Sequence, residues 1–414
     1  MKRRVVVTGL GAVTPVGNDV PSTWTALLQG QSGVTRITRF DATDFPVQIA
    51  AEVKGFRPEE HMDPREARHT DRFTIYAVAA AQEAWKHAGL QQDELDPQRV
   101  GVIIGSGIGG METLEKQHQN YLERGPRRIS PFFVPMLIGN MAAGQVSIAL
   151  GAQGPVSAVV TACATGTSAI GEAFRTIARG DADIVVAGGT EAAITPMALG
   201  GFCAARALST RNADPAGASR PFDQGRDGFV MGEGSGVVIL ESLECAEKRG
   251  ATILAEVVGY GQAGDAFHVV QPHPEAAGAA AAMARALHDA GWQPEEVDYI
   301  NAHGTSTSLN DRLETKAIKQ VFGQHAYRLA VNSTKSMTGH MLGAAGALEF
   351  IVVVQSMLSG TLHPTINLTE PDPDCDLDYV PNVARRQQID KALSNSLGFG
   401  GHNATLAIAR WEEQ

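Results

Sequence analysis

The chain has 414 residues, of which 43% are apolar and 19% are charged, and its formal net charge is −11 at pH 7. This length predicts more than one domain, because single domains usually have about 100–200 residues. The negative charge argues against nucleic acid as the main partner, since phosphates bind to basic surfaces. No run reaches the roughly 18 consecutive apolar residues that span a bilayer, so no membrane partner is expected.

The number and spacing of the cysteines indicate the redox compartment and whether disulfides or metal sites are expected. The four cysteines form no C-x-x-C pair and no compact cluster; they are Cys163, Cys203, Cys245 and Cys375. A disulfide framework and a metal site are therefore not expected, and a reducing cytoplasm fits this pattern.

Short β-branched strands alternate with alanine-rich helical stretches, which is typical of an α/β protein with buried sheets. The basic N-terminus resembles the start of a signal peptide, but Thr8, Gly9 and Pro15 interrupt the apolar run, so a first strand is predicted instead. Strands are predicted at 4–8, 100–104, 156–162, 184–187, 236–241, 253–260, 298–302, 329–333 and 404–408. Helices are predicted at 73–88, 166–179, 276–290, 312–322 and 343–358.

Glycine is abundant and clustered, with 45 residues in the chain. Such clusters are typical of tight turns and of close backbone approach. The pair Gly9 and Gly11 follows the first strand but lacks the third glycine of a dinucleotide fingerprint, so no nucleotide cofactor is expected.

No low-complexity linker divides the chain. A charged helix end meets a new strand at Arg249-Gly250, which predicts two halves, 1–250 and 251–414. The segments that begin at Thr161 and Thr338 share threonine, glycine and glutamate at a constant offset of 177 residues. An internal duplication would leave this echo and would place Cys163 and His340 at equivalent helix N-termini.

Cys163 is the first candidate for chemistry, because it lies at a predicted junction between a strand and a helix. Unpaired N–H groups and the positive end of the helix dipole are expected to lower the thiol pKa and favour the nucleophilic thiolate. The same N–H groups can hold an oxyanion. A free cysteine is also commonly a buried structural residue, and position alone does not separate the two interpretations.

Two histidine segments strengthen the catalytic interpretation. Asn301-Ala-His303-Gly-Thr-Ser-Thr places a histidine directly after a strand, and Ser333-Thr-Lys335-Ser-Met-Thr-Gly-His340 leads into a helix. A helix N-terminus disfavours imidazolium, so His340 is expected to stay neutral. Neither segment has the i, i+4 spacing of a zinc site on a helix.

These two segments, together with Thr161-Ala-Cys163 and Gly398-Phe399-Gly-Gly, resemble the signature segments of the β-ketoacyl-[acyl-carrier-protein] synthases. The match is closest to the elongating synthases of bacterial type II fatty acid synthesis, and it spans nearly the whole chain. The resemblance implies the thiolase fold: duplicated βαβαβαββ halves in five α-β-α-β-α layers, working as a homodimer.

The resemblance also implies the reaction. Cys163 would accept an acyl chain from acyl carrier protein (ACP), and His303 and His340 would stabilise the enolate that forms when malonyl-ACP loses carbon dioxide. Attack on the Cys163 thioester then gives a 3-oxoacyl-ACP two carbons longer. No cofactor and no metal is implied, because the substrates are carried on the phosphopantetheine arm of ACP.

Three further residues support this site in the family. Lys335 acts electrostatically, and Glu349 is its expected partner, because a glutamate within an apolar helix is costly unless it is paired. Backbone N–H groups of Cys163 and Phe399 would form the oxyanion hole, with the Phe399 ring as a gate. Glycines beside Phe399 permit that loop to move.

Substrate contacts are implied in the same way. Thr305 and Thr307 would bind the pantetheine arm, and Ile108, Phe133 and Phe202 match acyl-tunnel positions. Phe133 is expected to reach in from the other subunit, and ordinary core packing is the alternative for all three. Five arginines match the face on which acidic ACP docks, with scattered surface charge as the alternative; they are Arg65, Arg68, Arg127, Arg128 and Arg206.

Other functions were weighed against this one. Thiolase normally uses a second catalytic cysteine, whereas the glycine-rich loop here carries Phe399. An initiating synthase with a Cys-His-Asn set has asparagine where His340 stands. A non-catalytic chain-length-factor subunit lacks the nucleophilic cysteine, and Cys163 is present. A ketosynthase of a secondary-metabolite pathway stays open.

Overall fold

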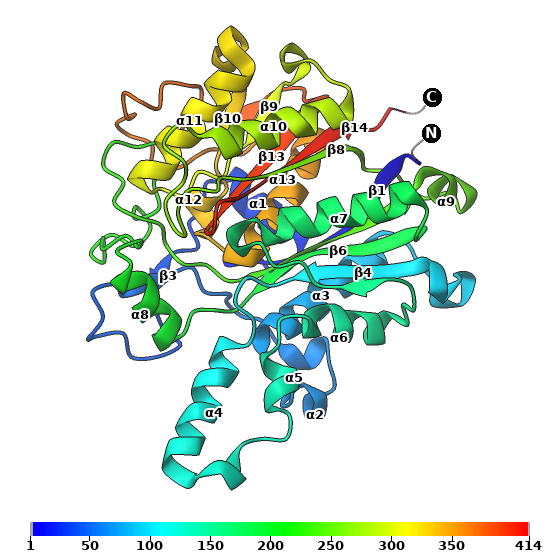
Figure 1. Ribbon diagram of the computed structural model, residues 1–414, viewed down its shortest axis with the longest axis vertical. Coiled ribbons are helices and arrows are strands. Elements are labelled where there is room, and N and C mark those ends of the chain that lie inside the picture. The colour runs from blue at the N-terminus through cyan, green and yellow to red at the C-terminus, as the bar shows by residue number, and fades with distance from the viewer. Residues whose placement is uncertain (1–2, 413–414) are drawn as a thin grey trace.

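A ten-stranded sheet organises the computed structural model, which describes residues 3–412 (Figure 1). Its strand order is β10-β9-β13-β14-β8-β1-β7-β6-β4-β5. The first five strands of this sheet in chain order are β1 (Val5–Val13), β4 (Val100–Gly105), β5 (Val156–Ser157), β6 (Ile184–Glu191) and β7 (Gly234–Ser242). The others are β8 (Ala255–Gly264), β9 (Tyr299–Asn301), β10 (Ala330–Asn332), β13 (Lys391–Gly398) and β14 (His402–Arg410). Short strand pairs join β2 (Thr35–Arg36) to β3 (Ile49–Ala50), and β11 (Thr361–Leu362) to β12 (Arg385–Arg386).

The strand order is symmetrical about the antiparallel pair β1–β8, which joins two sets of five strands. In one set β1, β7 and β6 pair antiparallel, and β4 then continues in parallel to β6 and β5. The other set repeats this with β8, β14 and β13, followed by β9 and β10. We infer from the repeat that the chain is an internal duplication with halves at 1–250 and 251–414.

Helices cover both outer faces and fill the space between the two sets of strands (Figure 1). Helices α3 and α6 pack on β1, β7, β6 and β4, whereas α10 packs on β8, β14 and β13 and carries α11 beside it. Helices α7 and α13 contact strands of both sets. The predicted layers α-β-α-β-α are therefore confirmed. The longer helices are α1 (Val20–Leu28), α3 (Arg72–His87), α4 (Met111–Arg124), α6 (Met141–Leu150), α7 (Thr165–Arg179), α8 (Pro196–Ala204), α10 (Ala277–Ala290), α11 (Ser308–Phe322) and α13 (Ala345–Ser359). The shorter ones are α2 (Pro64–Ala67), α5 (Phe133–Leu137), α9 (Leu243–Lys248) and α12 (Lys335–Thr338).

The two central helices are structural equivalents. Each has 15 residues and follows a short turn, Ala162–Ala164 before α7 and Leu342–Ala344 before α13. Ala162 and Leu342 both take positive φ, at 50° and 49°. All of these pairs differ by 180 residues, so the echo at an offset of 177 misaligned the halves. Cys163 is equivalent to Gly343, and His340 lies three residues earlier.

The Gly-x-Gly pair of β1 serves helix packing. A Cβ on Gly11 would lie 1.9 Å from the carbonyl oxygen of Ala80 in α3, so only glycine lets the helix approach. In the other half, a Cβ on Gly261 of β8 would lie 2.0 Å from the carbonyl oxygen of Ala282 in α10. Gly11, which resembled part of a nucleotide-binding motif, thus has a counterpart in Gly261, and each lets a helix pack closely on a strand.

Some predicted elements differ from the structure. The strand predicted at 156–162 has only two residues in the ladder, because the chain leaves the sheet to form the turn at Cys163. Strand β13 was not predicted, because its buried positions include Ser394, Asn395 and Ser396 instead of an apolar run. Helix α4 was also not predicted; most of its residues are polar, and of its residues only Thr113 is buried.

One helical stretch, Leu342–Ser359, is long and apolar enough by composition to cross a membrane, but 83% of it is buried inside the protein. It forms part of the central layer.

Candidate active site

Cys163 lies at the start of α7, where the chain turns sharply after an extended segment. The preceding residue, Ala162, has φ 50°, a left-handed conformation that costs energy in a residue with a Cβ. Cys163 is 9% exposed and reaches a cavity of about 340 Å³. The cavity gathers side chains from both halves of the chain, among them Phe202, Arg206, Phe229, His303, Thr305, Thr307, His340 and Phe399.

Burial dominates the electrostatics of the thiol. It raises the pKa of Cys163 to about 11, while the Lys335 charge and the backbone N–H of Phe399 act to lower it. The prediction of a depressed pKa is therefore wrong for the free enzyme, because loss of solvent outweighs the helix N-terminus. Cys163 is a neutral thiol at pH 7.

The two histidines face each other across the cavity. Their ring centroids are 5.2 Å apart and their planes are nearly perpendicular, at 86°. Nδ1 of His340 accepts a hydrogen bond from the backbone N–H of Leu342 at 3.3 Å. The proton of neutral His340 therefore lies on Nε2. Burial and the Lys335 charge hold the pKa of both His303 and His340 well below the usual 6.5.

The backbone of the His303 segment is held by a carboxylate of α11. Glu314 accepts hydrogen bonds from the backbone N–H groups of His303 and Gly304, both at 2.8 Å. Ser333 donates to the carbonyl oxygen of Gly304 at 2.7 Å. Burial raises the pKa of Glu314 to about 7. These bonds fix the position from which the His303 ring enters the cavity.

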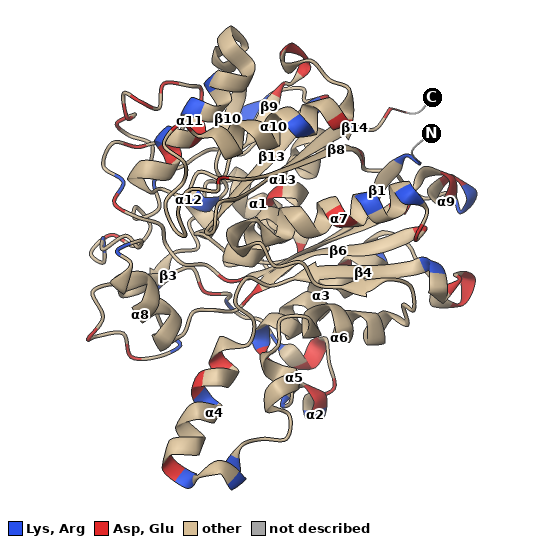
Figure 2. Ribbon diagram, viewed as in Figure 1, with Lys and Arg blue, Asp and Glu red and all other residues tan. Residues whose placement is uncertain are grey.

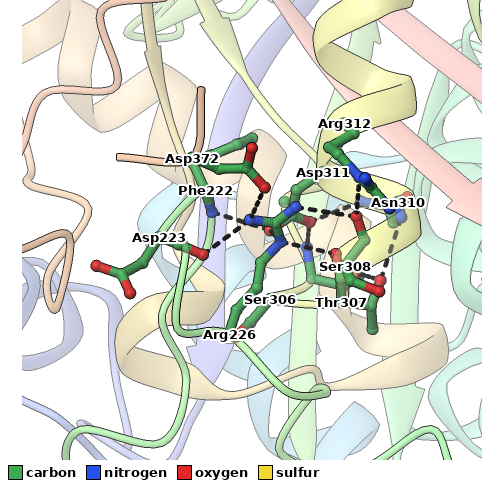
Figure 3. A network of polar contacts seen from close by, with 12 residues as sticks. Phe222, Asp223, Arg226, Ser306, Thr307, Ser308, Asn310, Asp311, Arg312 and Asp372 are labelled. Atoms are coloured by element: carbon green, nitrogen blue, oxygen red, sulfur yellow. Dashed lines mark hydrogen bonds and ion pairs between the residues drawn. The ribbon is translucent and has the colours of Figure 1, made fainter. Parts of the chain in front are cut away.

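A second buried carboxylate, Asp311, holds the turn that carries Thr305 and Thr307 (Figure 3). It accepts from the backbone N–H of Thr305 at 3.0 Å and from that of Phe222 at 2.9 Å. Figure 3 shows the buried Arg226 side chain beside it, donating to the carbonyl oxygens of Thr307 and Ser308. This network supplies hydrogen bonds that solvent would otherwise provide, and it fixes the shape of the turn.

Lys335 and Glu349 form a buried ion pair beneath the histidines. Their side chains are 1% and 2% exposed. Truncation of one member of such a pair usually costs about 3–5 kcal/mol, because it leaves an uncompensated charge. The positive charge also disfavours protonation of both histidines.

The glycine-rich loop after β13 closes over the cysteine. The backbone N–H of Phe399 interacts with the Cys163 sulfur, and the Phe399 ring lies 6.4 Å from that of Phe202. The loop is tied to segment 265–269: Gly400 donates to the carbonyl oxygen of Val269 at 2.7 Å, and the Asp265 N–H donates to that of Gly401 at 2.9 Å. These two bonds fix the position of the glycine-rich loop over Cys163.

Family models match both parts of the chain. The model of the N-terminal domain of β-ketoacyl synthase matches residues 2–246, and that of its C-terminal domain matches residues 254–369. This chain belongs to the β-ketoacyl synthase family.

Relatives and solved structures agree with that assignment. The synthase is 58% identical to 3-oxoacyl-[acyl-carrier-protein] synthase 2 of Coxiella burnetii and 57% identical to the protein of that name in Staphylococcus aureus, with 99% of each chain covered. A β-ketoacyl synthase from Burkholderia phymatum superposes with a TM-score of 0.92 at 37% identity. The ishigamide ketosynthase/chain length factor gives 0.93 at 36%, and both pairs are covered over 100% of their lengths. The predicted thiolase fold is confirmed.

The residues predicted to contact the pantetheine arm and the acyl tunnel are placed differently from one another. Thr305, Thr307 and Phe202 line the cavity, and the two threonine hydroxyls are 3.0 Å apart. Ile108 does not line it but packs against the same apolar cluster as Cys163 and Phe202. Phe133 lies on α5 and does not line the cavity of its own chain.

The five arginines predicted to dock ACP are all exposed, and none forms an ion pair within residues 3–412. Arg206 is the one that also lines the cavity. Arg127 and Arg128 follow α4 at the end of an arm that projects from the body, where Figure 2 shows basic segments.

Sequence reasoning missed several residues that shape the site: Asp311, Glu314, Arg226, Phe229 and Glu191. The Phe229 ring contacts that of His340, with centroids 5.3 Å apart. A usable pattern was present for Asp311 and Glu314, since two acids three residues apart open a helix directly after the His303 segment.

The histidine environments predict that neither imidazole titrates near neutral pH. With pKa values well below 6.5, both rings should stay neutral from pH 8 down to pH 6, because protonation would add a buried positive charge beside Lys335. Histidine-selective NMR over this range should show no midpoint near 6.5 for His303 or His340, assigned by replacing each with glutamine. In urea-unfolded protein both should titrate near about 6.5. A folded-state midpoint near 6.5 for either ring would contradict this electrostatic picture.

Proposed function

We propose that this synthase catalyses the decarboxylative Claisen condensation of acyl-ACP with malonyl-ACP in fatty acid chain elongation. One observation carries the proposal: a cysteine at a helix N-terminus shares a cavity with two neutral histidines. The cysteine supplies a place to hold an acyl group, and the histidines supply donors for a developing enolate.

Acyl transfer is the first step. The Cys163 thiol attacks the carbonyl carbon of acyl-ACP, the bond to the pantetheine sulfur breaks, and the thiol proton leaves with that sulfur. Negative charge on the carbonyl oxygen is stabilised by the N–H groups of Cys163 and Phe399. Apolar residues around Cys163, including Ile108 and Phe202, then receive the acyl chain.

Decarboxylation follows in the same cavity. Thr305 and Thr307 bind the pantetheine arm, and His303 and His340 donate to the thioester oxygen of malonyl-ACP. Nε2 of His340 is a donor, because its Nδ1 accepts from Leu342. Loss of carbon dioxide leaves its electron pair in the enolate, and preorganised donors lower the free energy of that charge.

Carbon–carbon bond formation ends the cycle. The enolate carbon attacks the acyl group on Cys163, the Cys163–acyl bond breaks, and the thiolate is protonated to restore the thiol. The Lys335–Glu349 pair maintains the electrostatic environment of the histidines. These steps balance with two thioesters and one proton, so no further cofactor is proposed.

The alternatives explain the chain less well. A chain-length-factor subunit would lack the nucleophile, whereas Cys163 and both histidines share one cavity here. A secondary-metabolite ketosynthase is disfavoured because identity falls to 36% with the ishigamide protein, against 58% with an enzyme named for 3-oxoacyl-ACP synthesis.

Two substitutions separate the half-reactions. Cys163→Gln should abolish acyl transfer and condensation while malonyl-ACP decarboxylation continues, because both histidines remain. His340→Ala should reduce decarboxylation by about 10²–10³-fold, the usual cost of losing one oxyanion-type donor. Release of labelled carbon dioxide from malonyl-ACP measures both effects. Decarboxylation at the wild-type rate in His340→Ala would remove that residue from the mechanism.

We further propose that the synthase works as a homodimer joined along β5. The opposite sheet edge, β10, is covered by the segment at Asp378, whereas β5 is an exposed edge strand. Such edges readily pair with another chain. Apolar side chains lie exposed on and near it: Ile148 is 74%, Val156 44% and Val160 59% exposed. A second copy would cover them and could bring its Phe133 to this cavity.

Charge at this edge should split the dimer. Ile148→Glu combined with Val156→Glu places like charges against each other across a two-fold axis, so light scattering should show the mass of one chain instead of two. Val383→Glu is a control for an added surface charge, because Val383 is 73% exposed and follows the segment at Asp378 that pairs with β10 at the opposite edge. A double variant that keeps the wild-type mass would place the interface elsewhere.

ACP is the proposed partner of the arginine face. A solved ketosynthase similar to this one, at 36% identity and a TM-score of 0.92, is described as a complex with a type II acyl carrier protein. In a chain of net charge −11, exposed arginines without ion pairs are suited to steer an acidic partner. Arg206 at the cavity mouth connects this face to the site.

Charge reversal tests the docking face. Arg127→Glu with Arg128→Glu should raise KM for acyl-ACP and flatten its salt dependence, since steering is screened by salt. Acylation by a short pantetheine thioester, which needs no docking, should change little. Arg328→Glu with Arg386→Glu is the matched control, because it makes the same change in net charge at exposed residues that do not line the cavity. An equal rise in KM for both double variants would show a general charge effect instead of a docking face.

A further inference from the structure

Glu191 is a buried carboxylate that the proposed mechanism does not use. It is the last residue of β6, in the apolar run Ile-Val-Val-Ala-Gly-Gly-Thr-Glu, and is 0% exposed. A buried carboxylate is costly unless donors surround it. The groups that donate to Glu191 therefore show which segments of the chain it holds in place.

Four donors converge on the two oxygens of Glu191. Oε1 accepts from the Ser106 hydroxyl at 2.8 Å and from the Ile108 N–H at 3.1 Å. Oε2 accepts from the N–H groups of Gly107 at 2.9 Å and Gly343 at 3.0 Å. The Ser106 oxygen in turn accepts from Gly109 at 3.0 Å, which directs its hydroxyl proton to Glu191. Every neighbour donates, as an ionised carboxylate requires.

The backbone closes around this carboxylate so tightly that glycine is required. A Cβ on Gly107 or on Gly343 would lie 2.8 Å from Oε2 of Glu191, and one on Gly343 would lie 2.4 Å from the Gly107 nitrogen. Two segments from opposite halves of the chain therefore meet at Glu191.

Each of these segments leads to a different part of the site. Ser106–Gly109 carries Ile108, which packs in the apolar cluster around Cys163. Gly343 belongs to the turn Leu342–Ala344, and the Leu342 N–H donates to Nδ1 of His340. One hydrogen bond joins Glu191 to Ile108 at the acyl pocket. Another joins it to Gly343, in the turn whose Leu342 N–H sets the tautomer of His340.

The duplicated fold explains why a carboxylate lies here. Gly343 is the equivalent of Cys163, and both precede a central helix with a positive N-terminus. At α7 that N-terminus faces the sulfur and the developing oxyanion. Before α13 the equivalent N–H group, that of Gly343, already donates to Glu191.

We propose that Glu191 is a positioning residue that joins the Ser106–Gly109 loop to the turn before α13, and so holds Ile108 and His340 in fixed relation. This inference rests on the proposed condensing function. It implies that the acyl pocket and the decarboxylation site are connected through one carboxylate.

Glu191→Gln tests the proposal with almost no change in volume. The amide nitrogen cannot accept, so either Ser106 and Ile108 or Gly107 and Gly343 lose their acceptor. We expect malonyl-ACP decarboxylation to fall by about 10- to 100-fold, the effect of small misplacements at a site. We also expect the ratio of long-chain to short-chain acylation of Cys163 to change at least fivefold. Wild-type condensation is measured first; its absence would reject the function and not this inference.

Two matched variants make the result decisive. Glu83→Gln alters a half-buried glutamate that also accepts two backbone N–H groups, from Ala12 and Val20, so it should lower stability to urea without either kinetic change. Ser106→Ala removes one donor on the loop side, so it should change chain-length selectivity at wild-type decarboxylation. The proposal is overturned if Glu191→Gln behaves like the wild type or like Glu83→Gln. Should Glu191→Gln not fold, Ser106→Ala decides: unchanged selectivity overturns the proposal.

Discussion

The close crossing of α7 and α13 is the constraint on which the active site depends. A Cβ on Gly166 would lie 2.6 Å from the nitrogen of Ala347, and one on Gly346 would lie 2.1 Å from the Thr167 hydroxyl. Only glycine at both positions lets the helices meet at this distance. Their N-termini are thereby brought to the centre of the molecule, which places Cys163 from one half beside His340 from the other. The strands, the outer helices and the buried Lys335–Glu349 pair hold this crossing in place.

Much of the fold could be predicted from the sequence, because apolar periodicity marks a strand or helix that buries one face. Prediction from apolar periodicity failed where buried positions carry polar side chains. Strand β13 is buried but carries Ser394, Asn395 and Ser396; the Asn395 side chain bonds to Thr405 and that of Ser396 to Thr167 within the core. The duplication was visible as an echo, yet the correct equivalence needed backbone geometry, since Ala162 and Leu342 share a conformation and no side-chain type.

The groups proposed to react could be named from the sequence, whereas most of the residues that hold them in place could not. Cys163, His303 and His340 stand in short segments whose residue types identify the chemistry. Arg226 and Glu191 act on backbone carbonyl and N–H groups far away in sequence, and a backbone group has no residue identity that a sequence pattern could match. The predicted direction of the Cys163 pKa shift was wrong for a related reason. The local sequence indicated a helix N-terminus, which lowers the pKa, whereas the burial that raises it is set by the whole fold.

The position of Phe399 has a consequence for how long an acyl group survives on the enzyme. The same residue supplies the backbone N–H directed at Cys163 and the ring that closes over the cavity. If Phe399 is the gate that the resemblance implies, that N–H moves away from Cys163 when the loop opens to admit a pantetheine arm. Water that enters during opening would then meet a thioester without its full set of oxyanion donors. Under this hypothesis access and activation exclude one another, which would protect the acyl-enzyme from hydrolysis while it waits for its second substrate.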